Sequence, residues 1–256
     1  MLPRIVLVET QGALNVGSVA RVMMNFEFSE LFLVNPRCNP KSEDAFKMAT
    51  HAKEILEKAK IVQNLEIALQ GCTRVIATTA KQRHRNRQLE GPQLPLSWLV
   101  QAETPNAIIF GAEDRGLSNE ELEWAQRWVR IPTGTYQTLN LAQSVAICCY
   151  ELFKIKEQSP QDLSKTATIS EAEINRINQF LGRWADQLQK VGFLQSHTRT
   201  NRMAKLRSIL YRSELSQNDL ALLEGIVSQT NWALRTNQRN TTKSLLNQDG
   251  KDTDRR

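Results

Sequence analysis

Short apolar runs rich in β-branched residues alternate with helix-like segments through the first 155 residues. The apolar runs lie at residues 5–8, 31–34, 75–77, 107–110 and 129–131. Helix-like segments lie between and after them, at about 16–27, 42–60, 118–127 and 138–155. Strands that alternate with helices usually pair in parallel, because each connection crosses over the sheet before the next strand begins. We therefore predict an α/β domain with a largely parallel sheet over residues 1–155.

The remaining residues follow three other patterns. Residues 156–168 are polar and aperiodic and contain Pro160, which is typical of a linker. Over residues 169–235, apolar positions recur every three or four residues, which predicts a small helical appendage. Residues 236–256 are rich in Asn, Thr, Lys and Asp, and we predict that they form a disordered tail.

Positive charge is concentrated in the second part of the chain. The formal net charge is +6, of which +5 falls on residues 156–256. A surplus of Lys and Arg attracts polyanions such as nucleic acids, although many proteins with such a surplus bind none. The predicted appendage carries Arg202, Lys205 and Arg212 beside one of its apolar stripes, and these are its candidate RNA contacts.

Composition gives no support to a metalloprotein or a membrane protein. The four cysteines show no C-x-x-C spacing and the three histidines are scattered, so they compose no metal site and the cysteines are expected to be reduced thiols. No stretch approaches the ~18 uncharged apolar residues that a membrane span needs. We expect a soluble, cytoplasmic protein that uses no metal and contacts no membrane.

The first polar cluster, NVGSVAR, runs from Asn15 to Arg21 at the predicted start of a helix. Asn15 is suited to cap that helix, because its side-chain oxygen accepts backbone N–H groups of the first turn. The preceding loop, QGAL, contains a glycine, and such a loop at a helix N-terminus also offers backbone N–H groups to an anion. These residues alone leave the helix cap and the phosphate site equally open.

The second cluster, GAEDRGLS, follows the apolar run at residues 107–110. Its flanking glycines, Gly111 and Gly116, fit a loop whose backbone comes close to another group. The cluster is not a Walker loop, because Gly116 is followed by Leu-Ser instead of Lys-Ser or Lys-Thr, and the chain contains no G-x-G-x-x-G. P-loop and dinucleotide enzymes therefore lose most of their support.

Two further clusters lie at predicted strand ends. The stretch at residues 131–152 passes from a predicted strand through a polar loop into an apolar helix. The loop, residues 133–138, either binds a ligand at the edge of the sheet or simply connects the strand to the helix. Another strand ends in Thr78-Thr79-Ala80. The basic run that follows is either a solvated loop or an RNA-backbone contact through Lys81, Arg83, Arg85 and Arg87.

Together these motifs resemble those of the SPOUT-class RNA methyltransferases, in the SpoU (TrmH) branch that methylates ribose 2′-hydroxyls. The resemblance covers about the first 155 residues, through IVLVET, NVGSVAR, LFLVNPR, FGAEDRGLSNEEL and YQTLNLAQSVA in the family's order. It is closest to members that modify the pyrimidine at nucleotide 32 of the tRNA anticodon loop. It implies a fold with a C-terminal deep trefoil knot, a homodimer formed through that domain, S-adenosylmethionine as methyl donor and tRNA as partner.

The resemblance also implies roles for individual residues. The catalytic residues of the family fall on Asn15, Arg21, Glu113 and Asn140. Its cofactor contacts fall on Thr78, Thr79, Ala80, Gly111, Ile131, Gln137, Thr138 and Leu139. Two positions depart from the family pattern. Thr138 stands where the family usually has serine, which retains the hydroxyl, and Ala112 stands where close relatives often have arginine, which removes a positive charge beside the site.

Two other functions are compatible with the same motifs. One is 2′-O-methylation of ribosomal RNA, and the other is RNA binding by a protein that keeps the fold without turnover. The presence of all four implied catalytic residues favours an enzyme. A small-molecule α/β enzyme that uses a nucleotide lacks its sequence fingerprints.

Overall fold

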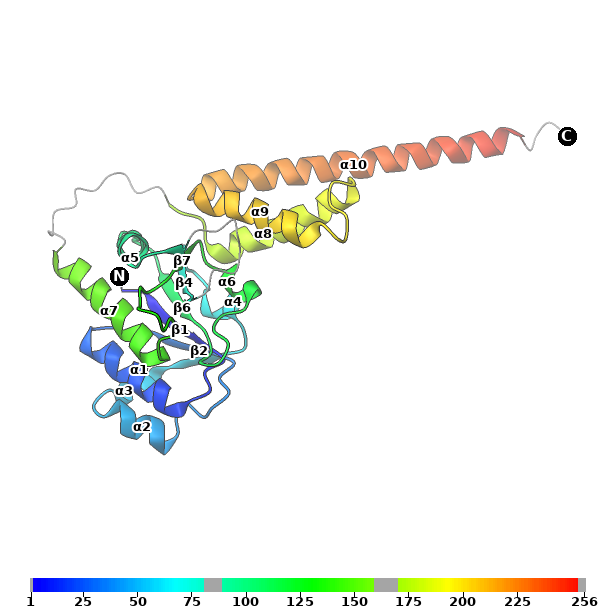
Figure 1. Cartoon of the computed structure of the whole chain (residues 1–256). Helices are drawn as coiled ribbons and strands as arrows, with labels where there is room; N and C mark the ends of the chain where they lie inside the picture. The colour runs from blue at the N-terminus through cyan, green and yellow to red at the C-terminus, as the bar shows by residue number, and fades with distance from the viewer. Residues whose placement is uncertain (1, 81–88, 159–169, 253–256) are drawn as a thin grey trace. The chain divides into compact units, whose positions relative to one another are not determined.

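The computed structural model describes residues 2–80, 89–158 and 170–252 of the 256-residue chain. The chain forms two compact units, shown in Figure 1. The first comprises residues 1–169 and 173–176, and the second comprises residues 170–172 and 177–256. The helical appendage was predicted to begin at residue 169, and the second unit begins at residue 170. The linker predicted over residues 156–168 begins inside a helix that continues to Gln158, and its remainder lies outside the described residues.

The first unit is built on a seven-stranded sheet in the order β3-β2-β1-β6-β4-β7-β5, and every pair of neighbouring strands is parallel. The predicted parallel α/β domain is confirmed. The strands are β1 (Arg4–Val8), β2 (Leu31–Val34), β3 (Lys60–Val62), β4 (Arg74–Thr78), β5 (Leu89–Glu90), β6 (Asn106–Phe110) and β7 (Arg127–Val129). The trefoil knot that the family resemblance implies stays a prediction.

Helices connect these strands and continue into the second unit. They are α1 (Ala13–Asn25), α2 (Glu43–Ala49), α3 (Lys53–Lys58), α4 (Leu65–Ala68), α5 (Gln93–Val100), α6 (Asn119–Leu122), α7 (Leu141–Gln158), α8 (Ile174–Lys190), α9 (Arg199–Arg212) and α10 (Gln217–Asp252).

Three predicted elements differ clearly from the structure in their bounds. The helix predicted at 42–60 is two helices, because Thr50 adopts a left-handed backbone conformation with φ of 51° and ends α2. The helix predicted at 118–127 is only the four-residue α6, and the strand predicted at 129–131 begins earlier, at Arg127.

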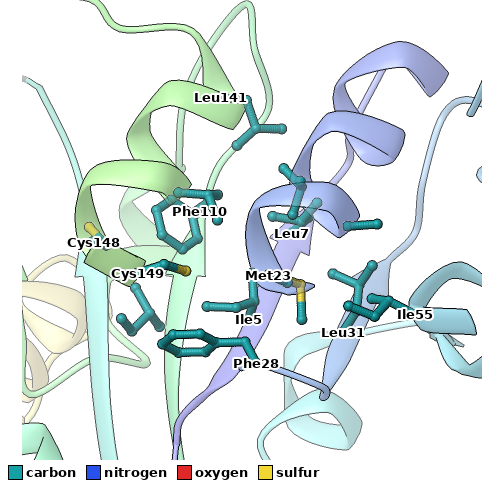
Figure 2. Close-up of a cluster of buried hydrophobic side chains, with 14 of the residues drawn as sticks. Ile5, Leu7, Met23, Phe28, Leu31, Ile55, Phe110, Leu141, Cys148 and Cys149 are labelled. Carbon is teal, nitrogen blue, oxygen red and sulfur yellow. The ribbon is translucent and has the colours of Figure 1, made fainter. Parts of the chain in front are cut away.

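A hydrophobic core fills one face of the sheet, as Figure 2 shows. Ile5 and Leu7 of β1 point from the sheet toward Met23 of α1 and Cys149 of α7, and all four are buried. Each fully buried aliphatic side chain of this size contributes about 1.5–3 kcal/mol to folding. Because α1 follows β1 and α7 follows β7, packing these two helices on one face brings both of their N-termini to the carboxyl edge of the sheet.

The second unit is a helical bundle. Helix α8 is amphipathic as predicted, with Ile177, Phe180 and Leu181 buried. Helix α10 contributes buried Leu220 and Val227, and its Glu224 pairs with Arg183 of α8 at 2.6 Å. This bundle is the predicted helical appendage.

The disorder predicted from residue 236 differs from the structure, where α10 continues to Asp252. Residues 236–249 contain neither Pro nor Gly. Asn, Thr and Ser disfavour a helix by only about 0.5–0.7 kcal/mol each relative to Ala. Propagating a helix is much easier than nucleating it, and the packed first half of α10 supplies the nucleus.

Candidate functional site

A pocket lies at the carboxyl edge of the sheet, where β4, β6 and β7 end. Ligands of open α/β folds bind at this edge. The pocket lining includes all eight residues proposed from the sequence as cofactor contacts: Thr78 at the end of β4 and Thr79 and Ala80 after it, Gly111 after β6, Ile131 after β7, and Gln137, Thr138 and Leu139 before α7.

The chemistry of the lining suits a ligand with flat apolar, polar and cationic parts. Val129, Ile131 and Leu139 offer apolar surface, while the threonine hydroxyls offer hydrogen bonds. The side chains of Glu113 and Asp114 add carboxylates to the same lining. The residues present therefore fit a sulfonium nucleoside, which has a heterocycle, a ribose and positive charge.

The loop after β6 can close on itself only because residue 111 is glycine. A Cβ atom at Gly111 would lie 2.2 Å from the carbonyl carbon of Gly116 and 2.2 Å from the backbone nitrogen of Leu117. The loop is also held by the Gly116 N–H, which donates to the Ala112 carbonyl at 2.8 Å. Gly116 has a φ of 69°, which other residues rarely adopt. Both glycines of the second motif are therefore explained by backbone geometry.

Glu113 joins this loop to the start of α1. Its Oε2 accepts a hydrogen bond from the Gln11 backbone N–H at 3.0 Å, and its Oε1 accepts one from the Gly12 N–H at 3.1 Å. The Asn15 side chain donates its Nδ2–H to the same Oε1 at 2.8 Å. The backbone N–H groups that the sequence suggested for a phosphate thus bind a carboxylate of the protein itself.

Asn140 completes the cluster from the third loop. Its Nδ2 donates to Asn15 Oδ1 at 3.1 Å, and its Oδ1 accepts the Ala142 N–H at 2.9 Å, at the start of α7. The helix cap, one of the two alternatives that the sequence left open for Asn15, is wrong, because the cap residue of α1 is Gly12 and Asn15 lies inside the first turn. Three of the four proposed catalytic residues therefore form one hydrogen-bonded cluster, Asn140–Asn15–Glu113, and Glu113 also lines the pocket.

The fourth proposed catalytic residue, Arg21, lies elsewhere on the chain. It is exposed, and six residues of helix separate it from Asn15, a rise of about 9 Å. Within the described ranges, no hydrogen bond or ion pair engages it. The structure of one chain therefore does not bring Arg21 to the pocket.

Ion pairs surround the second motif. The Arg115 guanidinium donates to both carboxylate oxygens of Glu121, at 2.8 and 2.9 Å, and to Glu9 Oε2 at 2.9 Å. Arg37 donates to the same oxygen of Glu9 at 2.6 Å. The hydrogen bond from Arg115 is the main reason that the pKa of Glu9 lies below its ordinary value, and Arg37 adds to this effect. Glu9 therefore stays ionised at neutral pH.

The proposed RNA contacts fall in two regions. Arg202, Lys205 and Arg212 are exposed on α9, at a spacing that places them on one side of the helix. The Arg202 guanidinium lies over the Phe193 ring, 4.9 Å from its centroid. The other four proposed contacts, Lys81, Arg83, Arg85 and Arg87, lie outside the described residues.

Neither a metal cluster nor a membrane span is found in the described part of the chain. No group of three or more His, Cys, Asp or Glu side chains there is arranged to hold a metal ion. Among the helices described, none has the length and apolar character needed to cross a bilayer.

Two family models match the chain, one to each unit. The model of the SpoU rRNA Methylase family matches residues 3–150. This chain belongs to the SpoU methylase family. The model of the C-terminal domain of the tRNA methyltransferase TrmJ matches residues 175–242, which places the chain in the TrmJ group of that family. The predicted family resemblance is confirmed.

Similar proteins cover nearly the whole chain. A tRNA (cytidine/uridine-2'-O-)-methyltransferase TrmJ from Sodalis glossinidius is 35% identical over 236 residues, 88% of this chain and 89% of the relative. A protein of the same name from Citrobacter koseri is 34% identical over 235 residues, 88% of this chain and 94% of the relative. The crystal structure of TrmJ from Z. mobilis ZM4 matches with a TM-score of 0.79 and 25% identity, covering 90% of this chain and all of that one. A probable methylase family protein from Haemophilus influenzae Rd KW20 matches with a TM-score of 0.60 and 31% identity, covering 93% and 100%.

Sequence reasoning on this SpoU-family chain missed the partners of Arg115. The residue stands in the second motif, but its contact with Glu9 joins positions 106 residues apart. The sequence of a glycine-rich loop does not indicate which distant carboxylate a charged residue of that loop will pair with. Ser144, which also lines the pocket and donates to the Asn140 carbonyl at 3.1 Å, lies within the motif YQTLNLAQSVA but was assigned no role.

Proposed function

We propose that this protein transfers a methyl group from S-adenosylmethionine to the ribose 2′-hydroxyl of the pyrimidine at nucleotide 32 in the anticodon loop of tRNA. The observation that carries this proposal is the Asn140–Asn15–Glu113 cluster beside a pocket lined by all eight predicted cofactor residues. The cluster unites three separate motifs at one edge of the sheet. A protein that only bound RNA would have no need of this arrangement beside a nucleoside pocket.

The pocket would hold the cofactor by its backbone and hydroxyl groups. Thr78, Thr79 and Thr138 supply hydroxyls for polar groups of the nucleoside, and Ile131 and Leu139 supply apolar walls for its base. When bound, the cofactor supplies a methyl group already activated by the positive charge of its sulfur. No metal is needed for such a transfer, because the leaving group departs as a neutral thioether.

The residues of the cluster would orient the attacking hydroxyl. Asn15 is fixed at both ends of its amide, since its Nδ2 donates to Glu113 and its Oδ1 accepts from Asn140. Methyl transfer needs an in-line approach of oxygen, carbon and sulfur, so positioning supplies much of the rate. Glu113 and Asn140 hold Asn15, and Asn15 contacts the ribose.

Arg21 would stabilise the negative charge that develops on the ribose oxygen and bind the adjacent phosphate. We assign it no role as a general base, because a guanidinium is effectively never deprotonated in proteins. A phosphate oxygen of the substrate is the proposed proton acceptor.

A homodimer would bring Arg21 to a pocket. The side of α1 that carries Arg21 also exposes Leu14, with 54% of its surface accessible, and α7 exposes Tyr150, with 49% accessible. Exposed apolar side chains on two neighbouring helices support an interface between two copies. In such a dimer, Arg21 of the partner subunit complements the Asn140–Asn15–Glu113 cluster of this one.

The second unit favours tRNA over ribosomal RNA as substrate. It matches the C-terminal domain of a tRNA methyltransferase over residues 175–242, and it exposes Arg202, Lys205 and Arg212 on one side of α9. Each cation that contacts phosphate releases condensed counterions and strengthens binding. Single-stranded loops allow bases to be splayed apart and gripped, so an anticodon loop is a suitable target.

The decisive experiment incubates the purified protein with methyl-labelled S-adenosylmethionine and, separately, with tRNA and ribosomal RNA. Label is expected in tRNA, on the ribose of nucleotide 32. Label confined to ribosomal RNA would overturn the tRNA substrate, and no label in either pool would overturn the enzymatic proposal. Replacing Arg21 by alanine is expected to lower kcat by at least ~100-fold with little change in cofactor affinity.

RNA binding by the second unit is tested by its salt dependence. Replacing Arg202, Lys205 and Arg212 together by alanine is expected to weaken tRNA binding and to reduce the slope of log affinity against log salt by about 3. The control replaces Lys47, Lys53 and Lys58, which are exposed on α2 and α3. An unchanged slope in the α9 variant, or an equal change in the control, would contradict the proposed role.

A further inference from the structure

Arg115 lines the pocket, but both terminal nitrogens of its guanidinium are bound by groups of the protein itself. One terminal nitrogen donates to Glu121 and to the Gly116 carbonyl at 3.0 Å, and the other donates to Glu121 and to Glu9. Two carboxylates therefore surround one guanidinium. Such a cation is neutralised by its own protein, so its contribution must be structural.

Glu9 receives this guanidinium at a special point of the backbone. It is the first residue after β1, and it adopts a left-handed conformation with φ of 50°. Such a conformation is unfavourable for a non-glycine residue, and it persists where the surroundings fix it. The Glu9 N–H donates to the Val34 carbonyl at 2.8 Å, and its carboxylate accepts from Arg37 and Arg115. Residue 9 is thus anchored to both its neighbouring strand and the second motif.

The two loops of the site are consequently joined twice. The Glu113 carboxylate binds the N–H groups of Gln11 and Gly12, and Arg115, two residues later, binds Glu9, two residues before Gln11. Opening the outer contact, Arg115–Glu9, leaves the inner contact of Glu113, with the hydrogen bond between Asp114 and Gln11 beside it, to hold the two loops together. Side chains held by one contact adopt a wider range of positions than those held by two.

We propose that the Glu9–Arg115–Glu121 ion-pair chain is a positioning device that holds Glu113 and Asn15 in the geometry needed for methyl transfer. This inference rests on the proposed function. It assigns Arg115 and Glu9 as positioning residues, because each would act on the site through its contacts with other protein groups. Glu121 serves the same device, because its carboxylate also accepts the Ser118 N–H at 2.6 Å and fixes the start of α6.

The first experiment compares kcat and KM for tRNA in Arg115→Gln, Glu9→Gln and Arg37→Gln. The first two are expected to lose roughly 10- to 100-fold in kcat, with smaller changes in KM. Arg37→Gln is the matched control, because Arg37 donates to the same carboxylate of Glu9 but donates no hydrogen bond to the described side chains of the second motif. Arg115→Lys keeps the charge and is expected to recover part of the lost rate.

A double-mutant cycle tests whether Glu9 and Arg115 act as one device. The double variant, with both residues changed to Gln, is expected to have a kcat close to that of Arg115→Gln alone. Losses that multiply would overturn the pairing. A kcat for Arg115→Gln within twofold of the wild type would overturn the proposal, as would an equal loss in Arg37→Gln.

A readout independent of turnover separates this proposal from the proposed function. Hydrogen exchange of the Gln11 and Gly12 amides reports directly on the inner contact to Glu113. Faster exchange is expected in Arg115→Gln and Glu9→Gln, but not in Arg37→Gln. If the wild-type protein methylates no RNA, the proposed function fails while this measurement still decides whether the ion-pair chain holds the loops. Unchanged exchange in Arg115→Gln would overturn the positioning role.

Discussion

Gly17→Ala is expected to destabilise the first unit, even though alanine favours helix more than glycine does. Gly17 is buried where α1 crosses α2. A Cβ atom there would lie 2.2 Å from the carbonyl oxygen of Ala45, 2.8 Å from Met48 Cβ and 3.0 Å from the carbonyl carbon of Ala45. Two of these atoms belong to the backbone, so no side-chain rotation relieves the overlap. The two helices must move apart by about 1 Å to restore van der Waals contact.

The expected magnitude follows from two opposing effects. Overpacking a well-packed core costs about 1–3 kcal/mol, and contact with backbone favours the upper end of that range. Replacing glycine by alanine inside a helix returns about 1 kcal/mol. The free energy of unfolding should therefore fall by about 2 kcal/mol. Because α1 also carries Asn15, the same shift should lengthen its contact with Glu113 and lower the methylation rate.

Urea unfolding followed by circular dichroism measures this change, with Gly182→Ala as the control. Gly182 lies inside α8, and a Cβ atom added there meets nothing within 4 Å. The control is expected to gain up to about 1 kcal/mol through helix propensity alone. If Gly17→Ala were as stable as the wild type or more stable, the close packing of α1 on α2 would be wrong.

Three further predictions concern the pocket loop, acid stability and the cysteines. Gly111→Ala is expected to weaken S-adenosylmethionine binding at least tenfold by calorimetry, since its Cβ would lie 2.2 Å from both Gly116 and Leu117. The pKa of Glu9 is lowered in the folded protein, so the ionised Glu9 side chain stabilises the fold fully above its ordinary pKa of 4.5. This stabilisation is lost as the pH falls through the lowered pKa. Thermal unfolding should therefore show a Tm that falls below about pH 4.5. Burial raises the pKa of Cys72 to about 11 and that of Cys148 to about 12, so iodoacetamide should modify neither thiol before the protein unfolds. Rapid labelling of either thiol in the native protein, detected by mass spectrometry, would contradict their burial.

The sheet and the pocket were predictable because each depends on local sequence. The apolar runs that became β1, β2, β4 and β6 are β-branched and uniformly buried, which is the pattern of central parallel strands. The outer strands β3, of three residues, and β5, of two residues, were not predicted, because strands this short leave little hydrophobic pattern in the sequence. The loops that end β4, β6 and β7 were located by their polar residues and glycines, and the family resemblance named the eight residues of these loops that line the pocket.

The contacts within the site were not predictable from the residues. Glu113 meets Asn15 across 98 residues, and Asn140 meets Asn15 across 125. Hydrophobic periodicity predicts which face of a helix or strand a side chain occupies, but it does not predict which distant residue that side chain contacts. The family resemblance named these three residues, whereas the hydrogen bonds that join them required coordinates. Disorder was predicted for residues 236–256 from composition, but helix α10 extends from its packed first half as far as Asp252, and residues 253–256 lie outside the described residues.

The orientation of the Asn15 amide follows from a fixed sequence of donors and acceptors. An ionised Glu113 only accepts hydrogen bonds, so it must receive the Nδ2–H of Asn15. Asn15 Oδ1 therefore faces Asn140, which must donate its own Nδ2–H and turn its Oδ1 to the N-terminus of α7. A flip of either amide would bring like groups together at two contacts. In the proposed mechanism, the remaining lone pair of Asn15 Oδ1 would accept the ribose hydroxyl. Asn15→Asp keeps an acceptor but places a carboxylate against Glu113, so it should lose more activity than its small change in shape suggests.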